Sequence, residues 1–252
     1  MIYALYLLVS AALGLFLYFR WQYATLFHPK LYREDAFDER FRFLSVTSED
    51  GIRLEGCIFE PKSYRCTLLY FGGRGQDSVG LLPKLSYCYP DFRIVTFNYR
   101  GYGKSEGKPD EKSIMQDALL VYEKVKKNFG EVELAGYSLG CAVASYVAAN
   151  TDVKRLFLIA PFASLKSLVQ DVHGFSLPLL RYRFDTCAYL ARTTARVHIF
   201  VSRDDNIVPI KNARRLQKCA ALEAFVELDS LNHVQILCSE KVMDALESYL
   251  SR

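Results

Sequence analysis

The pentapeptide Gly-Tyr-Ser-Leu-Gly at residues 136–140 constrains the fold of this chain more than any other stretch. An apolar run at 132–135 precedes it and a run of small residues at 141–149 follows it, which predicts a strand, a sharp turn and a helix. Such a turn exposes the hydroxyl of Ser138 above the sheet edge, at the positive N-terminus of the helix. The two glycines are needed because strand and helix crowd the turn. The pattern indicates a nucleophilic serine, and an ordinary glycine-flanked turn is the alternative.

Alternating strand and helix patterns predict a mostly parallel sheet. Continuous apolar runs, typical of strands buried on both faces, occur at residues 67–71, 92–97, 132–135, 156–159, 197–201 and 224–228. Helical periodicity lies between or after them, most clearly at 110–128 and again at 212–219 and 240–250. This alternation predicts a doubly wound sheet, which binds ligands at the carboxyl ends of its strands.

An antiparallel pair of strands is predicted at the N-terminal edge of this sheet. Residues 41–46 and 52–59 both alternate apolar and polar side chains, and the turn signal Glu49-Asp50-Gly51 lies between them. The chain has 252 residues, of which 51% are hydrophobic, enough for one domain with a large core and a short appendage. We therefore assign residues 41–252 to one α/β domain and residues 28–40 to a linker.

Residues 1–27 have the features of a membrane anchor. Residues 1–19 carry no charge, and nineteen residues at helical rise span about 28 Å, close to the hydrocarbon thickness of a bilayer. Arg20, Trp21 and Tyr23 follow, as is typical of a membrane interface. These features predict one transmembrane helix that binds the lipid bilayer through residues 1–19, with the α/β domain on the cytoplasmic side by the positive-inside rule. A cleaved signal peptide and an N-terminal core helix are the alternatives.

The overall charge and the cysteines exclude some classes of protein. The 32 basic and 28 acidic residues give a net charge of +4, which is too balanced to favour nucleic-acid binding. The seven cysteines show no C-x-x-C pair or metal-like cluster; they stand at positions 57, 66, 88, 141, 187, 219 and 238. This odd and dispersed set predicts buried thiols and no disulfide framework, which favours a reducing compartment. The sequence makes no prediction about the oligomeric state.

A second motif lies beside the serine turn. Residues 98–107 read N-Y-R-G-Y-G-K-S-E-G and resemble the D-Y-R-G-Y-G-x-S-x-G stretch common in α/β-hydrolases. With the parallel strands and the G-x-S-x-G turn, the region from about residue 41 to the C-terminus is identified as a member of this superfamily. The apolar N-terminus, the short insertion and the Phe184-Asp185 pair resemble membrane-tethered single-domain members, which include protein depalmitoylases and lipid esterases. The resemblance implies an α/β-hydrolase fold with a short lid insertion at about 161–195, and no metal or organic cofactor.

A serine nucleophile needs a base, and the chain has only four histidines. His28 lies before the α/β domain, and His198 lies within a predicted strand, as a hydrogen-bonded core residue would. His233 follows the last predicted strand, so that a loop carries it to the carboxyl end of the sheet, where the base belongs in the order Ser, acid, His. His233 is therefore the predicted base, and His173 in the insertion is the alternative.

The acid is expected in the loop after the preceding strand. Residues 202–209, S-R-D-D-N-I-V-P, resemble the family's G-x-x-D-x-x-V-P with Ser202 in place of the glycine. Asp205 falls on the acid position, where it would accept a hydrogen bond from the His233 ring and stabilise the imidazolium. Asp204 is the competing candidate.

The tetrahedral intermediate of acyl transfer needs two backbone N–H donors. Leu139, directly after the serine, is one predicted donor. The other should come from residues 71–75, F-G-G-R-G, where Gly72 stands in place of the family's usual histidine and Arg74 supplies the N–H. A phosphate cradle is disfavoured because no G-K-[ST] follows. The predicted substrate-binding residues are Gly72, Gly73, Tyr137 and Phe162.

Together these residues predict acyl transfer to water. Ser138 would attack an ester or thioester carbonyl, His233 would relay the proton, and water would hydrolyse the acyl-enzyme. The apolar N-terminus predicts a lipid-like acyl substrate at a membrane surface, as do the apolar side chains of the insertion: Phe162, Leu165, Phe175, Leu177, Leu179 and Leu180. A serine peptidase and a non-catalytic membrane-anchored scaffold are the alternatives.

Overall fold

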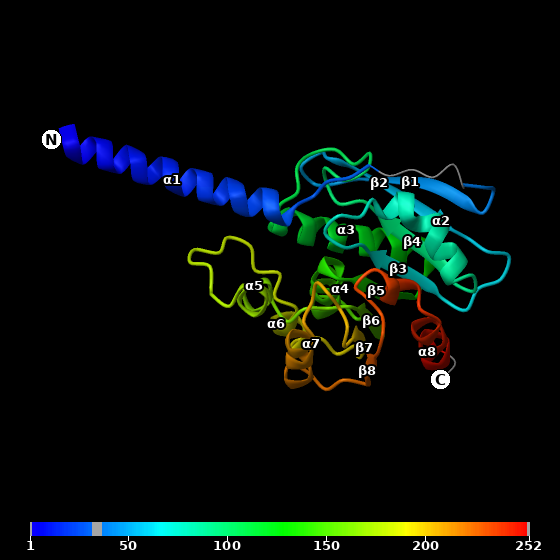
Figure 1. Ribbon diagram of the computed structural model, residues 1–252. Helices are drawn as coiled ribbons and strands as arrows, with labels where there is room; N and C mark the ends of the chain where they lie inside the picture. Colours follow the sequence, from blue (N-terminus) through cyan, green and yellow to red (C-terminus); the bar gives the residue numbers. More distant parts are fainter. Residues whose placement is uncertain (1, 32–36, 251–252) are drawn as a thin grey trace.

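The computed structural model describes residues 2–31 and 37–250, and within them one sheet of eight strands carries the fold (Figure 1). The strands are β1 (Phe41–Thr47), β2 (Arg53–Phe59), β3 (Thr67–Phe71), β4 (Arg93–Phe97), β5 (Val132–Tyr137), β6 (Arg155–Ile159), β7 (Arg196–Ser202) and β8 (Ala224–Leu228). The α-helices are α1 (Ile2–Leu26), α2 (Ser78–Cys88), α3 (Glu111–Phe129), α4 (Leu139–Ala149), α5 (Leu165–His173), α6 (Thr186–Leu190), α7 (Ile210–Ala213) and α8 (Glu240–Leu250), with short 3₁₀ helices η1 (Arg214–Lys218) and η2 (Gln235–Cys238).

The strand order is β1-β2-β4-β3-β5-β6-β7-β8. The first two pairs, β1 with β2 and β2 with β4, are antiparallel, and every other neighbouring pair is parallel. The predicted mostly parallel sheet with an antiparallel N-terminal edge is therefore confirmed. The parallel strands place the ends of β3, β5, β7 and β8 on one edge of the sheet, which is where the candidate site lies.

Two hydrophobic clusters cover the two faces of the sheet, because successive strand residues point to opposite sides. In β5, Leu134 belongs to the cluster under α3 and α4, and Ala135 belongs to the cluster under α2 and α8. The strand is buried along its whole length, as its continuous apolar run predicts. Such a strand holds the turn that follows it firmly in place.

Helix α2 has no counterpart among the helices predicted from the sequence. Gly80 and Pro83 lie inside it, and both residue types lower helix propensity. Asp77 caps its N-terminus by accepting a hydrogen bond from the Gly80 N–H at 2.9 Å. Burial of Val79 and Leu82 against the sheet stabilises the helix despite its low intrinsic propensity.

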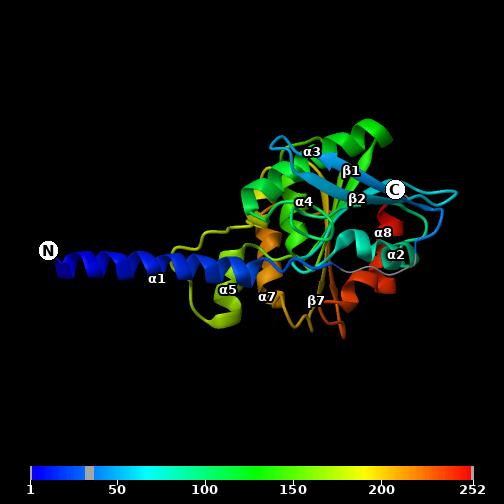
Figure 2. The same cartoon turned by 90° about the horizontal axis from the view of Figure 1, so that it is seen from above.

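Helix α1 extends away from the α/β domain, and only its C-terminal end packs against it (Figures 1 and 2). Leu26 and Phe27 are buried in the main cluster, and the Phe27 ring meets the edge of Tyr182 with ring centroids 5.0 Å apart. Along the described part of the chain, no helix is long and apolar enough to cross a membrane, so the predicted transmembrane helix at residues 1–19 is not found there. Met1 of the expected anchor and residues 32–36 of the expected linker lie outside the described residues.

Two disulfides correct the prediction that all seven cysteines are free thiols. Cys88 at the end of α2 bonds to Cys238 at the end of η2, and Cys187 in α6 bonds to Cys219 after η1. The partners are 150 and 32 residues apart in sequence, so that only the tertiary fold brings them together. The expectation of a reducing compartment loses its basis. The free cysteines of the described chain stand at positions 57, 66 and 141.

Candidate active site

Ser138 occupies the turn between β5 and α4. Its backbone has φ 53° and ψ −116°, in a region that residues with a side chain rarely adopt. The Ser138 N–H donates to the Ile159 carbonyl at 2.9 Å, and the Ser138 carbonyl accepts from the Cys141 N–H at 3.0 Å. The predicted strand, sharp turn and helix are therefore confirmed, with the serine at the strained position.

The two glycines of the pentapeptide have no space for a side chain. A Cβ atom on Gly136 would lie 2.5 Å from the Gly140 carbonyl oxygen. A Cβ atom on Gly140 would lie 2.0 Å from the carbonyl oxygen of Phe71, at the end of β3. The second contact also shows that the end of β3 approaches the serine turn closely.

Asp205 and His233 come together from two neighbouring loops. Asp205 follows β7 and His233 follows β8, and the His233 Nδ1 lies 2.7 Å from the Asp205 Oδ2. The side chains are only 3% and 9% exposed, respectively. The other carboxylate oxygen accepts from the N–H groups of Ile207 and Val208, both at 2.8 Å. This carboxylate is fixed by its own loop, and with the proton on Nδ1 the histidine presents Nε2 as an acceptor.

Tyr137 connects His233 to the serine turn. The Tyr137 hydroxyl donates to the His233 carbonyl at 2.8 Å, and the two rings lie with centroids 5.1 Å apart. Burial raises the pKa of Tyr137 well above its usual range, which keeps the hydroxyl protonated as a donor. Because Tyr137 directly precedes Ser138, this contact places the His233 loop beside the serine. Tyr137 is itself buried, and its hydroxyl is taken up by this contact.

Three polar residues at the end of β7 and in the loop after it brace the loop that carries His233. The Asn206 Oδ1 accepts from the His233 N–H at 3.2 Å, and the Ser202 hydroxyl donates to the Leu231 carbonyl at 2.6 Å. Asp204, the competing acid candidate, accepts from the Ser230 N–H at 2.7 Å. Asp204 therefore holds the loop, while Asp205 contacts the imidazole.

The other histidines lie elsewhere. His198 is buried in β7 between the rings of Phe157 and Tyr249, and burial lowers its pKa to about 4. His173 is the last residue of α5, and His28 lies beside the end of α1 with Nε2 3.1 Å from the Thr25 carbonyl.

The glycine loop after β3 lies against the serine turn. A Cβ atom on Gly73 would lie 3.5 Å from the Ser138 Cβ and 3.1 Å from the Tyr137 ring. The Arg74 carbonyl accepts from the Tyr102 hydroxyl at 2.7 Å, and Arg74 Nη1 donates to the Thr25 carbonyl at 3.0 Å. The loop therefore runs past the serine, as predicted for an oxyanion loop. Leu139, the other predicted donor, is the first residue of α4, where backbone N–H groups have no partner within the helix.

Gln76 explains why the loop lacks the family's usual histidine. Its Oε1 accepts from the Gly73 N–H at 2.8 Å and from the Tyr70 hydroxyl at 2.9 Å. A Cβ atom on Gly72 would lie 2.1 Å from the Ser78 hydroxyl, which leaves no space for a side chain at that position. In this chain a glutamine four residues further along braces the loop.

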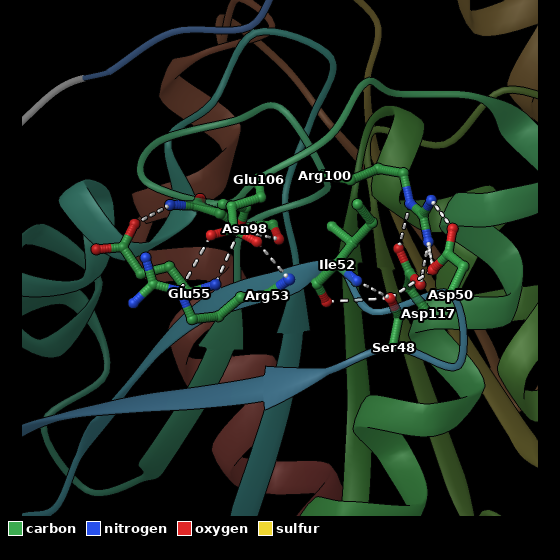
Figure 3. A network of polar contacts seen from close by, with 10 residues as sticks. Ser48, Asp50, Ile52, Arg53, Glu55, Asn98, Arg100, Glu106 and Asp117 are labelled. Carbon is green, nitrogen blue, oxygen red and sulfur yellow. Dashed lines mark hydrogen bonds and ion pairs between the residues drawn. The ribbon is translucent and has the colours of Figure 1, made fainter.

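Asn98, at the end of the neighbouring strand, supports this loop and also contacts Glu55 (Figure 3). Its Oδ1 accepts from the Ser78 N–H at 2.7 Å, at the start of α2. Its Nδ2 donates to the carboxylates of Asp77 at 2.7 Å and Glu55 at 3.0 Å. An amide fits here because it offers donors to two carboxylates and an acceptor to the helix, whereas the family's aspartate at this position has only acceptors when ionised.

Arg100 fixes the other end of the same stretch (Figure 3). It donates two hydrogen bonds of 2.7 Å to Asp117 of α3 and two, of 2.9 and 3.2 Å, to Asp50. The bond from Arg100 holds the pKa of Asp50 well below its usual range. These pairs join the β1–β2 turn to α3 and leave Arg100 too firmly bound to serve a substrate.

A cavity of about 250 Å³ lies between α1, the lid insertion and the acid loop. Its lining residues are Trp21, Gln22, Thr25, Leu26, Arg74, Leu165, Leu168, Val169, Val172, His173, Leu177, Leu180, Tyr182, Asn206 and Ile207. Of the predicted apolar lid residues, Leu165, Leu177 and Leu180 line it. Phe175 and Leu179 are exposed on the surface, and Phe162 is buried in the main hydrophobic cluster.

Metal ligands do not gather in the described chain. Residues 2–31 and 37–250 hold no group of three or more His, Cys, Asp or Glu side chains that could bind a metal ion.

The sheet order, the strained serine turn and the buried Asp–His pair define the class as a hydrolase built on a parallel α/β sheet. Residues 67–196 match the alpha/beta hydrolase fold family, and the chain belongs to that family. The chain is 29% identical over 223 residues to an uncharacterized protein of Mycobacterium tuberculosis, covering 83% of this chain and 79% of that protein. It is 31% identical over 175 residues to the lysophosphatidylserine lipase ABHD12 of Danio rerio, covering 60% of this chain and 45% of the lipase.

Solved structures share the fold at low sequence identity. The Pyrococcus furiosus esterase Pf2001 superposes with a TM-score of 0.70 at 16% identity, covering 90% of this chain and 97% of the esterase. Acetyl xylan esterase 1 from Thermoanaerobacterium sp. superposes with a TM-score of 0.66 at 17% identity, covering 88% and 86%. These similarities agree with the fold and leave the substrate to be argued from the site.

Proposed function

We propose that the protein is a serine hydrolase that cleaves carboxylic esters or thioesters through an acyl-enzyme. The observation that carries the proposal is the buried 2.7 Å contact between Asp205 and His233, held by Tyr137 beside the strained turn of Ser138. In this reading Ser138 is the nucleophile, His233 the general base and Asp205 the acid that orients it. The family membership and the esterase and lipase relatives support this assignment.

The reaction follows from these roles. His233 Nε2 takes the hydroxyl proton as the Ser138 oxygen attacks the acyl carbon, and Asp205 stabilises the imidazolium that forms. The imidazolium then gives this proton to the leaving alcohol or thiol. Water, deprotonated by the same histidine, then attacks the acyl carbon. The bond to the Ser138 oxygen breaks, the imidazolium returns the proton to that oxygen, and the carboxylic acid leaves. No cofactor enters this sequence of steps.

The oxyanion would be held by backbone N–H groups of Leu139 and Arg74. Leu139 begins α4, so the positive end of the helix faces the developing charge. Arg74 lies on the loop that passes Ser138, with its carbonyl turned to the Tyr102 hydroxyl and its side chain to α1. Donors that are fixed before the substrate arrives make such stabilisation effective.

A lipid-like acyl substrate at a membrane surface is the substrate class that we favour. Large apolar side chains of α1, including Leu7, Phe16 and Trp21, are at least half exposed. In the lid, Phe175 and Leu179 are also exposed. Such a surface is costly in water and suits a lipid bilayer. The similarity to a lysophosphatidylserine lipase points to the same class of substrate. The side of the membrane on which the α/β domain lies stays a prediction.

A panel of p-nitrophenyl esters and acyl thioesters of graded length, with peptide amides beside them, tests the proposal. The wild-type protein is expected to hydrolyse esters or thioesters, with longer acyl chains preferred over acetate, and Ser138→Ala to lose this activity. Preference for the amides would favour the peptidase alternative. If neither the wild type nor Ser138→Ala hydrolyses any of these substrates, the result would favour the alternative of a non-catalytic scaffold.

A further inference from the structure

A buried glutamine in α1 holds part of the lid. Gln22 is only 4% exposed in a helix whose other end projects into the surroundings. Its Nε2 donates to the Leu179 carbonyl at 3.3 Å, and its Oε1 accepts from the Arg181 N–H at 3.0 Å. One turn earlier, the Tyr18 hydroxyl donates to the Pro178 carbonyl at 2.5 Å. These contacts satisfy the backbone of an irregular lid segment, so α1 and the lid form one unit.

The same end of α1 touches the loop beside the nucleophile. The Thr25 carbonyl accepts from Arg74 Nη1 at 3.0 Å, and Arg74 follows Gly73, which lies against Ser138. In both overall views the C-terminal half of α1 runs beside α5 and the lid segment that follows it (Figures 1 and 2). The helix therefore reaches from the lid to the expected oxyanion loop.

The cavity of about 250 Å³ lies between α1 and the lid, and it reaches the loops that carry Arg74 and Asn206. Thr25 and Trp21 of α1 line one side, and Leu168 and Val169 of α5 line the opposite part. Arg74 and Ile207, two residues from Asp205, lie at the end toward the site. A concave pocket with a largely apolar lining beside catalytic loops is the kind of place where small molecules bind.

The chemistry of the lining favours one occupant. Besides Arg74 and His173, no lining side chain is ionisable at neutral pH, and most are apolar or aromatic. The Arg74 guanidinium is already bonded to the Thr25 carbonyl. An apolar chain gains free energy from such surroundings, while a charged or strongly polar group loses its hydration. The walls at Trp21 and Val172 are half exposed, which leaves an opening toward the surface that carries the apolar side chains of α1.

We infer that the C-terminal half of α1 is a wall of the acyl-chain site, and that Trp21 and Thr25 set the length of acyl chain accepted. This inference rests on the proposed function, because it takes the occupant to be the acyl group that Ser138 attacks. The acyl chain enters along α1 and lies between α1 and α5 with its carbonyl at the Arg74 end. Gln22 keeps the lid closed over it and is a positioning residue.

The test replaces a residue that lines the cavity with a larger one. The control makes the same replacement at the neighbouring residue, which does not line the cavity. Thr25→Trp fills the space between α1 and α5, whereas Ala24→Trp places the same side chain at an exposed position of α1 that does not line the cavity. Full-length protein in detergent is assayed for kcat/KM with p-nitrophenyl palmitate and p-nitrophenyl acetate. We expect the palmitate-to-acetate ratio to fall at least about ten-fold in Thr25→Trp and to stay at the wild-type value in Ala24→Trp. Equal ratios in the two variants, with esters hydrolysed, would overturn the inference and leave the proposed function standing.

A second readout does not depend on turnover. In the Ser138→Ala background, a diazirine analogue of palmitate is photo-crosslinked and the modified residues are located by mass spectrometry. Labelling of Leu168 or Val169 that Thr25→Trp removes and Ala24→Trp retains supports the acyl site, even if no ester is hydrolysed and the proposed function fails. Labelling that both variants retain contradicts the acyl site.

Discussion

Burial of His198 predicts a specific pH dependence of stability. The side chain is 1% exposed in β7, stacked on Phe157 and in tilted contact with Tyr249, and its Nδ1 finds no hydrogen-bond partner among the described residues. Burial disfavours the imidazolium and lowers the pKa to about 4, against about 6.5 for an exposed histidine. Glu223 opposes this shift and Arg155 supports it, both by charge, and both effects are smaller than that of burial.

The sign and size follow from proton linkage. Between pH 6.5 and pH 4 the unfolded chain binds a proton at His198 and the folded chain does not, so the free energy of unfolding falls as the pH falls. The contribution of the neutral His198 to the free energy of unfolding is complete above pH 6.5 and is lost as the pH approaches 4. The difference between pKa values of about 6.5 and about 4 corresponds to about 3 kcal/mol.

Urea unfolding followed by circular dichroism, at intervals from pH 4 to pH 7.5, measures this effect. His198→Phe keeps a ring between Phe157 and Tyr249 and removes the titrating group. We expect the free energy of unfolding of the wild type to fall by about 3 kcal/mol more than that of His198→Phe over this range. The carboxylates contribute equally to the pH dependence of unfolding in the two proteins. Parallel pH profiles would therefore refute the assignment of a neutral buried imidazole.

Three further substitutions test the surroundings of the serine. Asn98→Asp places a third carboxylate beside Asp77 and Glu55 and removes two hydrogen-bond donors. The free energy of unfolding at pH 7 should therefore fall by about 3 kcal/mol, and an unchanged unfolding midpoint would contradict the network. Gly140→Ala forces a Cβ atom against the Phe71 carbonyl, which should cost about 3 kcal/mol and lower kcat, and a fully active, stable variant would count against the close approach. Asp205→Asn should keep the melting temperature within a few degrees and lower kcat by about 10²- to 10⁴-fold in ester hydrolysis, and undiminished kcat would exclude Asp205 as the acid.

The sheet and much of the candidate site follow from local sequence patterns. Strands buried on both faces leave continuous apolar runs, and the serine turn leaves two glycines that its crowding requires. The loops after β7 and β8 were placed correctly because parallel strands bring their carboxyl ends to one edge. The sequence therefore predicts the Asp205–His233 contact, and the structure confirms that these two side chains meet.

Features that depend on tertiary contact left no such pattern. The bond between Cys88 and Cys238 joins α2 to the end of η2, and nothing in the spacing of the two cysteines indicates it. Gln22 reads as a polar break at the end of an apolar segment, and its role appears only when the lid backbone lies beside it. Phe162 belongs to an apolar run that fits a core or a substrate wall equally well from sequence, and the fold buries it in the core.

Covalent labelling with a fluorophosphonate, followed by peptide mass spectrometry, tests the central claim most directly. The probe reacts with a serine only when a base activates it and an oxyanion site receives the developing charge. We predict that wild-type protein is labelled on the peptide that contains Ser138, that Asp205→Asn is labelled much more slowly, and that Ser138→Ala is not labelled. Absence of labelling in the wild type, or equal labelling of Ser138→Ala, would contradict the assignment of Ser138 as an activated nucleophile.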